Sequence, residues 1–125
     1  MSDSFHFVKL DHVQVAMPSG EEQAAREFYA GILLMQEIEK PEKLRPRGGV
    51  WFVCGEQQIH LGVEAHFVPA QKAHPAFRVS GWQALRSKLL ALGYTVKDDD
   101  EIEGISRFFT NDPFGNRLEF IEHLP

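Results

Sequence analysis

The sequence predicts an α+β fold made of two copies of one unit, each consisting of a strand, a helix and three further strands. Three observations support this prediction. Strand-like and helix-like patterns follow one another in the same order in both halves of the 125-residue chain. Each half carries a helix-start signal after its first strand. Potential metal ligands also recur at similar offsets: His74 follows His12 by 62 positions (74 − 12), and Glu119 follows His60 by 59 (119 − 60).

The first unit begins with residues 8–17, where apolar and polar residues alternate as in a strand with one face against a helix. Pro18 ends this strand. Ser19 and Glu22 have the spacing of a capping box, and the apolar residues that follow predict a helix that stops near Gly31. Three more strands are expected at residues 34–39, 49–54 and 57–64, with a loop rich in Pro, Gly and charge over 41–49.

The second unit repeats this order. A strand from His74 to Val79 leads to Ser80, which with Gln83 forms a second capping box, and the helix is expected to end at Gly93. Three further strands are predicted at residues 94–98, 105–110 and 116–122, with a tight turn over 111–116 and an acidic surface loop over 98–103.

The domain boundaries follow from these patterns. We expect one domain over residues 1–125, with module one at about 6–64, a linker at 65–73 and module two at 74–123. The linker contains Pro69 and has no clear hydrophobic period. A hydrophobic content of 43% is sufficient for one compact core.

Composition excludes several classes of function. The single cysteine, Cys54, cannot form an internal disulfide, and we interpret it as a small buried hydrophobic residue, not a ligand. No signal peptide and no membrane span are evident, so we expect a cytoplasmic protein. The formal net charge of −5 argues against a nucleic-acid partner. A small molecule is the expected partner.

The main functional hypothesis is a metal site. Side chains alternate between the two faces of a strand, and four potential ligands all lie opposite the aliphatic residues of their strands. They are His12, His60, His74 and Glu119. Three nitrogens and one oxygen suit one divalent Fe, Mn, Zn, Ni or Co ion, whereas Mg and Ca prefer oxygen ligands. The remaining histidines, His6, His66 and His123, are interpreted as surface residues.

Two further residues are candidates for substrate binding. Arg78 has the same strand phase as His74, so it could bind a carboxylate or phosphate, or pair with a nearby acid at the rim of the sheet. Gln14 has the phase of His12 and could donate a hydrogen bond to an oxygen near the metal.

Three motifs make nearly the whole chain similar to the vicinal oxygen chelate superfamily. They are Asp11-His12-Val13 with Phe28-Tyr29 after it, His74-Pro75-Ala76-Phe77, and the run from Asn111 to Glu119, NDPFGNRLE. That superfamily includes glyoxalase I, fosfomycin-resistance thiol transferases, extradiol dioxygenases, methylmalonyl-CoA epimerase and bleomycin-resistance proteins.

The resemblance implies a pair of βαβββ modules whose curved mixed sheets surround a shared cavity and one divalent metal. In members of this size the modules commonly pair across a homodimer. His12 and His60 of one chain would then meet His74 and Glu119 of its partner. The metal would hold two adjacent oxygens of a substrate and stabilise an enolate or oxyanion.

The resemblance leaves the reaction open. Glyoxalase I commonly has a glutamate where this chain has His60, and the fosfomycin enzymes usually have a threonine where it has Gln14. The leading expectation is therefore a metal-dependent lyase, isomerase or related enzyme. The alternatives are a metal-free protein that sequesters a drug or small ligand, as in bleomycin resistance, an extradiol-type dioxygenase, and a structural or regulatory module with a vestigial site.

Overall fold

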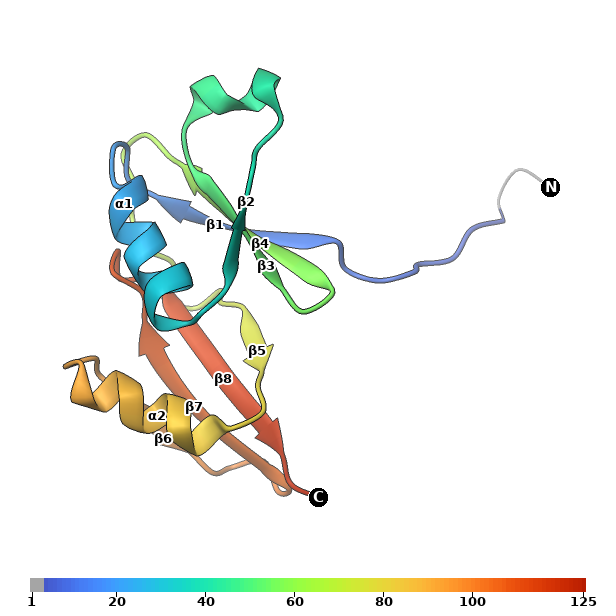
Figure 1. Ribbon diagram of the computed structural model, residues 1–125. Coiled ribbons are helices and arrows are strands. Elements are labelled where there is room, and N and C mark those ends of the chain that lie inside the picture. Colours follow the sequence, from blue (N-terminus) through green and yellow to red (C-terminus); the bar gives the residue numbers. More distant parts are fainter. Residues whose placement is uncertain (1–3) are drawn as a thin grey trace.

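The computed structural model describes residues 4–125, which form two modules with one four-stranded mixed sheet each (Figure 1). The strand order is β1-β4-β3-β2 in the first sheet and β5-β8-β7-β6 in the second. The two orders correspond strand for strand, so the predicted α+β duplication is confirmed. The two sheets are separate and do not join into one closed barrel.

Module one contains β1 (His12–Met17), α1 (Glu22–Ala25), the π-helix η1 (Arg26–Ile32), β2 (Gln36–Ile38), the 3₁₀ helix η2 (Glu42–Arg47), β3 (Val50–Cys54) and β4 (Gln57–Val63). Module two contains β5 (Ala76–Arg78), α2 (Trp82–Ala91), β6 (Lys97–Asp99), β7 (Ile105–Asn111) and β8 (Arg117–His123). In each module the first and last strands are parallel, and the other neighbours are antiparallel.

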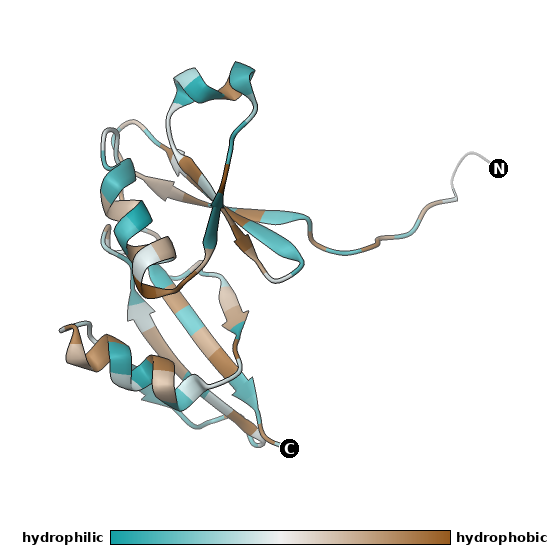
Figure 2. Ribbon diagram, in the orientation of Figure 1, coloured by the Kyte–Doolittle hydropathy of each residue, from teal (hydrophilic) through white to brown (hydrophobic). Residues whose placement is uncertain are grey.

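The helices of both modules lie on the same side of the molecule, and each covers one face of its sheet (Figure 1). Hydrophobic and hydrophilic residues alternate along β8, as expected of a strand with only one face in the core (Figure 2). The buried core is formed by apolar residues of both modules: Val15, Met17, Ala25, Phe28, Tyr29, Val50, Phe52, Ile59, Leu61, Phe77, Leu89, Phe108, Leu118 and Phe120. The opposite face of each sheet is called the inner face below.

The predicted capping box of the first helix is wrong. The helix begins at Glu22 without a side-chain cap, and the Glu22 carboxylate instead accepts a hydrogen bond from the backbone N–H of Gly49 at 2.8 Å. Gly49 has a φ of 87°, and a Cβ there would lie 2.2 Å from the carbonyl oxygen of Leu61. Glu22 is therefore used to hold the loop before β3 against the helix, a role that its local sequence could not show.

The second predicted capping box is also wrong. The residue before α2 is Gly81, and neither Ser80 nor Gln83 caps the helix. The Glu122 carboxylate of β8 accepts a hydrogen bond from the backbone N–H of Trp82 at 2.9 Å. A free backbone N–H at the start of α2 is thus satisfied by a residue 40 positions away, which the local sequence of the helix could not predict.

Several element boundaries also differ from prediction. The strand expected over 8–17 starts only at His12, and residues 4–11 extend away from the sheets as an exposed segment (Figure 1). The strand expected over 94–98 lies at 97–99 instead. β6 includes Asp98 and Asp99, which were expected in the acidic loop, because the backbone of residues 97–99 pairs with β7. Arg86 of α2 and Arg107 of β7 also pair with these two carboxylates.

The two modules are held together by buried polar contacts. Tyr29 of module one donates a hydrogen bond to Asp112 of module two at 2.8 Å, and both residues are buried. Burial and the neighbouring Asp112 carboxylate raise the pKa of Tyr29, so its hydroxyl remains a donor. The Asn116 amide donates to the carbonyl of Ala16 at 2.8 Å. Among the described residues, no helix is long and apolar enough to cross a membrane.

Candidate metal and substrate site

The inner faces of the two sheets carry the predicted site residues. In module one the strand register places His12 opposite Gln58, Gln14 opposite His60, and His60 opposite Trp51, so all five share a face. In module two Glu119 lies between Ala76 of β5 and Phe109 of β7, with Arg107 and Arg117 at alternate positions of the same face. His74 precedes β5 by two residues.

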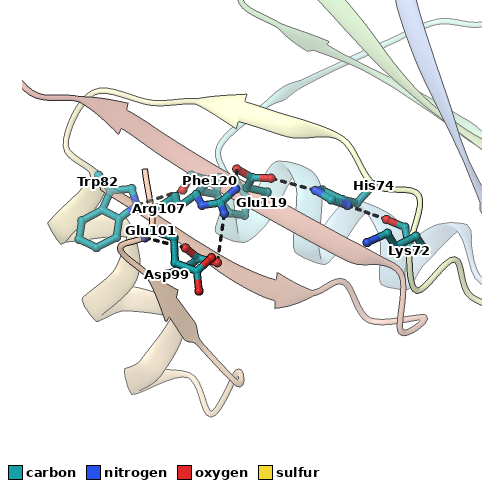
Figure 3. A network of polar contacts seen from close by, with 8 residues as sticks. All are labelled: Lys72, His74, Trp82, Asp99, Glu101, Arg107, Glu119 and Phe120. Atoms are coloured by element: carbon teal, nitrogen blue, oxygen red, sulfur yellow. Dashed lines mark hydrogen bonds and ion pairs between the residues drawn. The ribbon is translucent and has the colours of Figure 1, made fainter. Parts of the chain in front are cut away.

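His74 and Glu119 form a close pair in module two. Nε2 of His74 lies 2.8 Å from Oε1 of Glu119, an ion pair when the imidazole is protonated (Figure 3). Nδ1 of His74 donates to the backbone carbonyl of Lys72 at 2.8 Å. Both ring nitrogens of His74 therefore face oxygen acceptors, and a metal ion bound between His74 and Glu119 would take the place of the proton on Nε2.

Arg107 holds the other oxygen of the same carboxylate. Nη1 of Arg107 donates to Oε2 of Glu119 at 3.2 Å, and Nη2 pairs with Oδ2 of Asp99 at 3.1 Å (Figure 3). Nε of Arg107 is buried without a hydrogen-bond partner among the described residues. Glu119 is therefore oriented from both sides, with Oε1 left on the side of His74.

His12 has a similar orienting partner in module one. Its Nδ1 donates to the carboxylate of Asp11 at 2.9 Å, which leaves the Nε2 lone pair free. Its ring stacks on that of His60, with centroids 4.1 Å apart and 14° between the planes. His60 in turn stacks on Trp51 at 3.8 Å and 5°. The three rings form one continuous stack on the inner face.

The stack limits what His60 can do in this arrangement. Its Nε2 bonds to Oε1 of Gln58 at 2.8 Å, so the free lone pair is on Nδ1. Lone pairs of imidazole lie in the ring plane, so those of two nearly parallel stacked rings do not converge on one ion. Burial, and next the nearby His12, lower the pKa of His60, which keeps the ring neutral at pH 7.

The four predicted ligands thus form two pairs, not one cluster. Within residues 4–125, no three His, Cys, Asp or Glu side chains come together closely enough to hold an ion. His12 and His74 do line the same cleft of about 990 Å³, which lies between the edge strands β1 and β5.

The two predicted substrate-binding residues line that cleft as well. Gln14 lies over Gly62, where a Cβ would come within 2.6 Å of the Gln14 amide. The glycine therefore makes room for the glutamine side chain. Arg78 is exposed, and it pairs with no carboxylate among residues 4–125, so the rim ion pair considered from sequence is not formed.

The nitrogen and oxygen donors of these residues are of the types that divalent transition metals prefer. Both His12 and His74 donate their Nδ1 proton to an oxygen, the usual outer support of a metal-binding histidine. Cys54 is only half buried, and burial raises the pKa of its thiol, which disfavours the thiolate form needed for metal binding.

Sequence reasoning missed several residues of the inner faces: Trp51, Gln58, Arg107, Phe109 and Arg117. The alternation of side chains along the strands could have identified the three module-two residues as lying on the inner face. Arg107 and Phe109 alternate with buried Phe108, and Arg117 alternates with buried Leu118. Their pairing partners could not be identified from phase, since Arg107 reaches Glu119 and Asp99 on two neighbouring strands.

Known proteins with solved structures share this architecture. A glyoxalase family protein from Bacillus anthracis is 48% identical, with 96% of this chain and 98% of that chain covered and a TM-score of 0.93. Two more distant proteins share the fold. A lactoylglutathione lyase from Agrobacterium tumefaciens is 19% identical, with 91% of this chain and 92% of that chain covered and a TM-score of 0.73. A glyoxalase/dioxygenase from Nostoc punctiforme is 18% identical, with 98% and 100% of the two chains covered and a TM-score of 0.75. No family model and no curated protein sequence matches the chain.

Proposed function

Because this chain belongs to the glyoxalase family, we propose that it is a divalent-metal-dependent enzyme, a lyase, isomerase or related catalyst, acting on a small molecule with adjacent oxygens. The observation that carries the proposal is the approach of Nε2 of His74 to Oε1 of Glu119 at 2.8 Å. The other polar atom of each group is already hydrogen-bonded, Nδ1 of His74 to the Lys72 carbonyl and Oε2 of Glu119 to Arg107. A histidine and a carboxylate that served only as a surface ion pair would not need this double orientation.

We assign His12, His74 and Glu119 as the principal ligands, since each offers one lone pair whose direction is set by a hydrogen bond to the other side of its group. His60 completes the set when its ring turns out of the stack with Trp51 and His12. The mixed nitrogen and oxygen donors suit one Fe, Mn, Zn, Ni or Co ion per site.

When bound, the metal would supply a Lewis acid that holds the adjacent oxygens and stabilises negative charge developing on them. Side chains of the inner faces would transfer protons and bind the substrate. When His60 stays in the stack and outside the ligand set, its ring is neutral and its free Nδ1 can accept a proton instead. Gln14 can donate its amide hydrogens to a substrate oxygen, and Arg78 can bind an acidic group at the mouth of the cleft.

A homodimer would assemble the site. Each module supplies half of the ligand set, and the strands that border the cleft, β1 and β5, are both edge strands with one unpaired side. The segment before β1 exposes large apolar side chains, namely Phe5, Phe7, Val8 and Leu10. These features support pairing of His12 and His60 of one chain with His74 and Glu119 of the other.

Mixing two defective variants tests both the metal and the dimer. His12→Ala and Glu119→Gln should each lose zinc on its own. If sites form between chains, a dimer of one variant with the other has one intact site and one doubly altered site. After joint refolding, random pairing should restore about a quarter of the wild-type zinc content, measured by elemental analysis of untagged protein.

Two results would contradict the proposal. Wild-type protein that folds normally but retains no zinc, manganese, iron, nickel or cobalt would refute a metalloenzyme. Persistent binding of a small ligand after chelation would then favour a metal-free sequestering protein. Metal lost in both variants and absent from their mixture would place each site within one chain instead.

A second candidate function is extradiol-type dioxygenation, and the stacked position of His60 favours it. With His60 outside the ligand set, two histidines and one carboxylate remain, the facial arrangement typical of non-haem iron oxygenases. Iron-dependent oxygen consumption with a catechol would support this alternative over a lyase or isomerase.

A further inference from the structure

The inner face of module two is rich in arginine. Arg78, Arg107 and Arg117 project from three different strands of one sheet, although the whole chain has a net charge of −5. Arg78 and Arg107 lie in one row, since each is paired in the sheet register with Ile121 of β8. A concentration of positive charge on one face of an acidic protein favours an anionic ligand there.

The three arginines differ in how their charge is used. Arg107 pairs with Glu119 and Asp99, so its charge is compensated. Arg117 forms no ion pair with any carboxylate of residues 4–125. Its Cζ instead lies 4.0 Å from the centre of the Phe109 ring. The ring holds the guanidinium in place through its flat face and leaves the N–H groups at its edge available.

Arg117 is also close to the proposed metal ligands. It precedes Glu119 by two residues on the same face of β8, a spacing of about 6.7 Å between Cα atoms. Phe109 also contacts the His74 ring edge-on, with centroids 5.4 Å apart. Arg117 lines the same cleft as His12 and His74. A group bound to Arg117 would therefore lie within one small molecule's length of the metal ligands.

The strands of module one place no charged side chain on the inner face that would compete with the arginines for an anion. Its strand positions contain no Asp, Glu, Lys or Arg: they are His12, Gln14, Ala16, Gln36, Ile38, Trp51, Val53, Gln58, His60 and Gly62. Together, the two inner faces offer stacked aromatic rings and amides on one side and uncompensated guanidinium groups on the other.

We propose that Arg117, braced by Phe109, is the main anion-binding residue of the site, with the exposed Arg78 contributing less, and that the substrate carries a carboxylate a few bonds away from its adjacent oxygens. The planar guanidinium can donate two parallel hydrogen bonds to a carboxylate, which fixes the orientation of the substrate as well as its charge. This assignment rests on the proposed function, because it defines the substrate class of the same site.

The test compares two probes that differ only in the carboxylate. Catechol and 3,4-dihydroxybenzoate share a pair of adjacent oxygens, and their dissociation constants are measured by anaerobic calorimetry with zinc-loaded protein and with chelated protein. Wild-type protein should prefer 3,4-dihydroxybenzoate by about tenfold, the contribution expected of one charge-assisted contact. Arg117→Gln should remove most of this preference, leaving only the smaller contribution of Arg78, while the catechol constant and zinc content stay unchanged.

Two further variants separate the binding role from a structural one. Phe109→Leu keeps an apolar side chain but removes the ring under the guanidinium, so it should reduce the preference in part. Arg86→Gln, on α2 and paired with Asp98 of β6, removes the same charge away from the cleft and should preserve the preference. Circular dichroism and thermal melting check that each variant is folded.

Equal affinity of wild-type protein for the two probes would overturn the proposal, as would a preference that is undiminished in Arg117→Gln or is reduced equally in Arg86→Gln. Failure of the proposed function has a different signature, namely no zinc bound by wild-type protein. The chelated samples still measure the carboxylate preference in that case, and binding of neither probe in either form would overturn the assignment of Arg117.

Discussion

Nε2 of His74 and Oε1 of Glu119 lie 2.8 Å apart, while the other side of each group is held by a separate partner. The Lys72 carbonyl accepts the Nδ1 proton of His74, and Arg107 binds Oε2 of Glu119. The two donors that face each other are thus positioned before any ligand arrives, which lowers the entropic cost of binding an ion between them.

Glu119→Gln should weaken zinc binding at least about tenfold, because a neutral amide replaces an anionic oxygen ligand. Competition calorimetry against a chelator of known affinity measures the change. His66→Asn is the control, since His66 is exposed, outside both sheets, and at a φ of 55° that asparagine tolerates. An unchanged zinc dissociation constant in Glu119→Gln would exclude this carboxylate as a ligand.

His60→Gln should weaken zinc binding less than Glu119→Gln does. The His60 ring lies between those of Trp51 and His12 and must leave this stack before it can join the ion. The same competition calorimetry gives both values from matched preparations. Equal losses in the two variants would show that His60 is a full ligand from the start.

Arg78→Ala should raise the dissociation constant of an acidic ligand such as 3,4-dihydroxybenzoate by up to about fivefold and leave zinc content unchanged. The effect is expected to be modest because Arg78 is exposed and its interactions are screened by solvent. Calorimetry at low salt measures the ligand, and elemental analysis measures the metal. Unchanged ligand affinity would remove Arg78 from the binding site.

Tyr29→Phe should lower the free energy of unfolding by about 1–2 kcal/mol, because it removes a buried hydrogen bond to the Asp112 carboxylate between the modules. Urea denaturation followed by fluorescence measures the loss. Tyr94→Phe removes a hydroxyl from a partly buried tyrosine that packs on Phe28, and it should change stability by less. Equal losses would mean that the Tyr29 hydroxyl has no special role between the modules.

The stability of the protein should depend on Glu22 at low pH. The backbone N–H of Gly49 lowers the pKa of Glu22 in the folded state below the ordinary value of 4.5. The unfolded chain therefore binds the proton first as pH falls, so this stabilisation is present above pH 4.5 and is lost as pH falls through the folded pKa.

Glu22→Gln should consequently show a shallower loss of unfolding free energy below pH 4.5 than wild-type protein. Denaturation midpoints at a series of pH values provide the comparison, with Glu21→Gln, an exposed neighbour, as the control. Parallel pH profiles for wild type and Glu22→Gln would show that the bond to Gly49 does not contribute.

The sequence by itself determined the duplicated α+β architecture, because alternating apolar residues can bury only one face of a strand and the order of such strands was the same in both halves. The same periodicity predicted an inner face for His12, His60 and Glu119. These are local properties, since the direction of a side chain along a strand depends only on its position within that strand.

Only the tertiary structure decided how those residues are used. The start of α2 is satisfied by the distant Glu122 carboxylate, whereas Glu22 at the start of α1 accepts a hydrogen bond from the loop residue Gly49. Arg107 joins two neighbouring strands through Glu119 and Asp99. The stacking of His60 between Trp51 and His12, and the support of Arg117 by Phe109, also depend on strands brought together by folding. Such contacts form between positions far apart in the chain, where sequence periodicity carries no information about register or pairing.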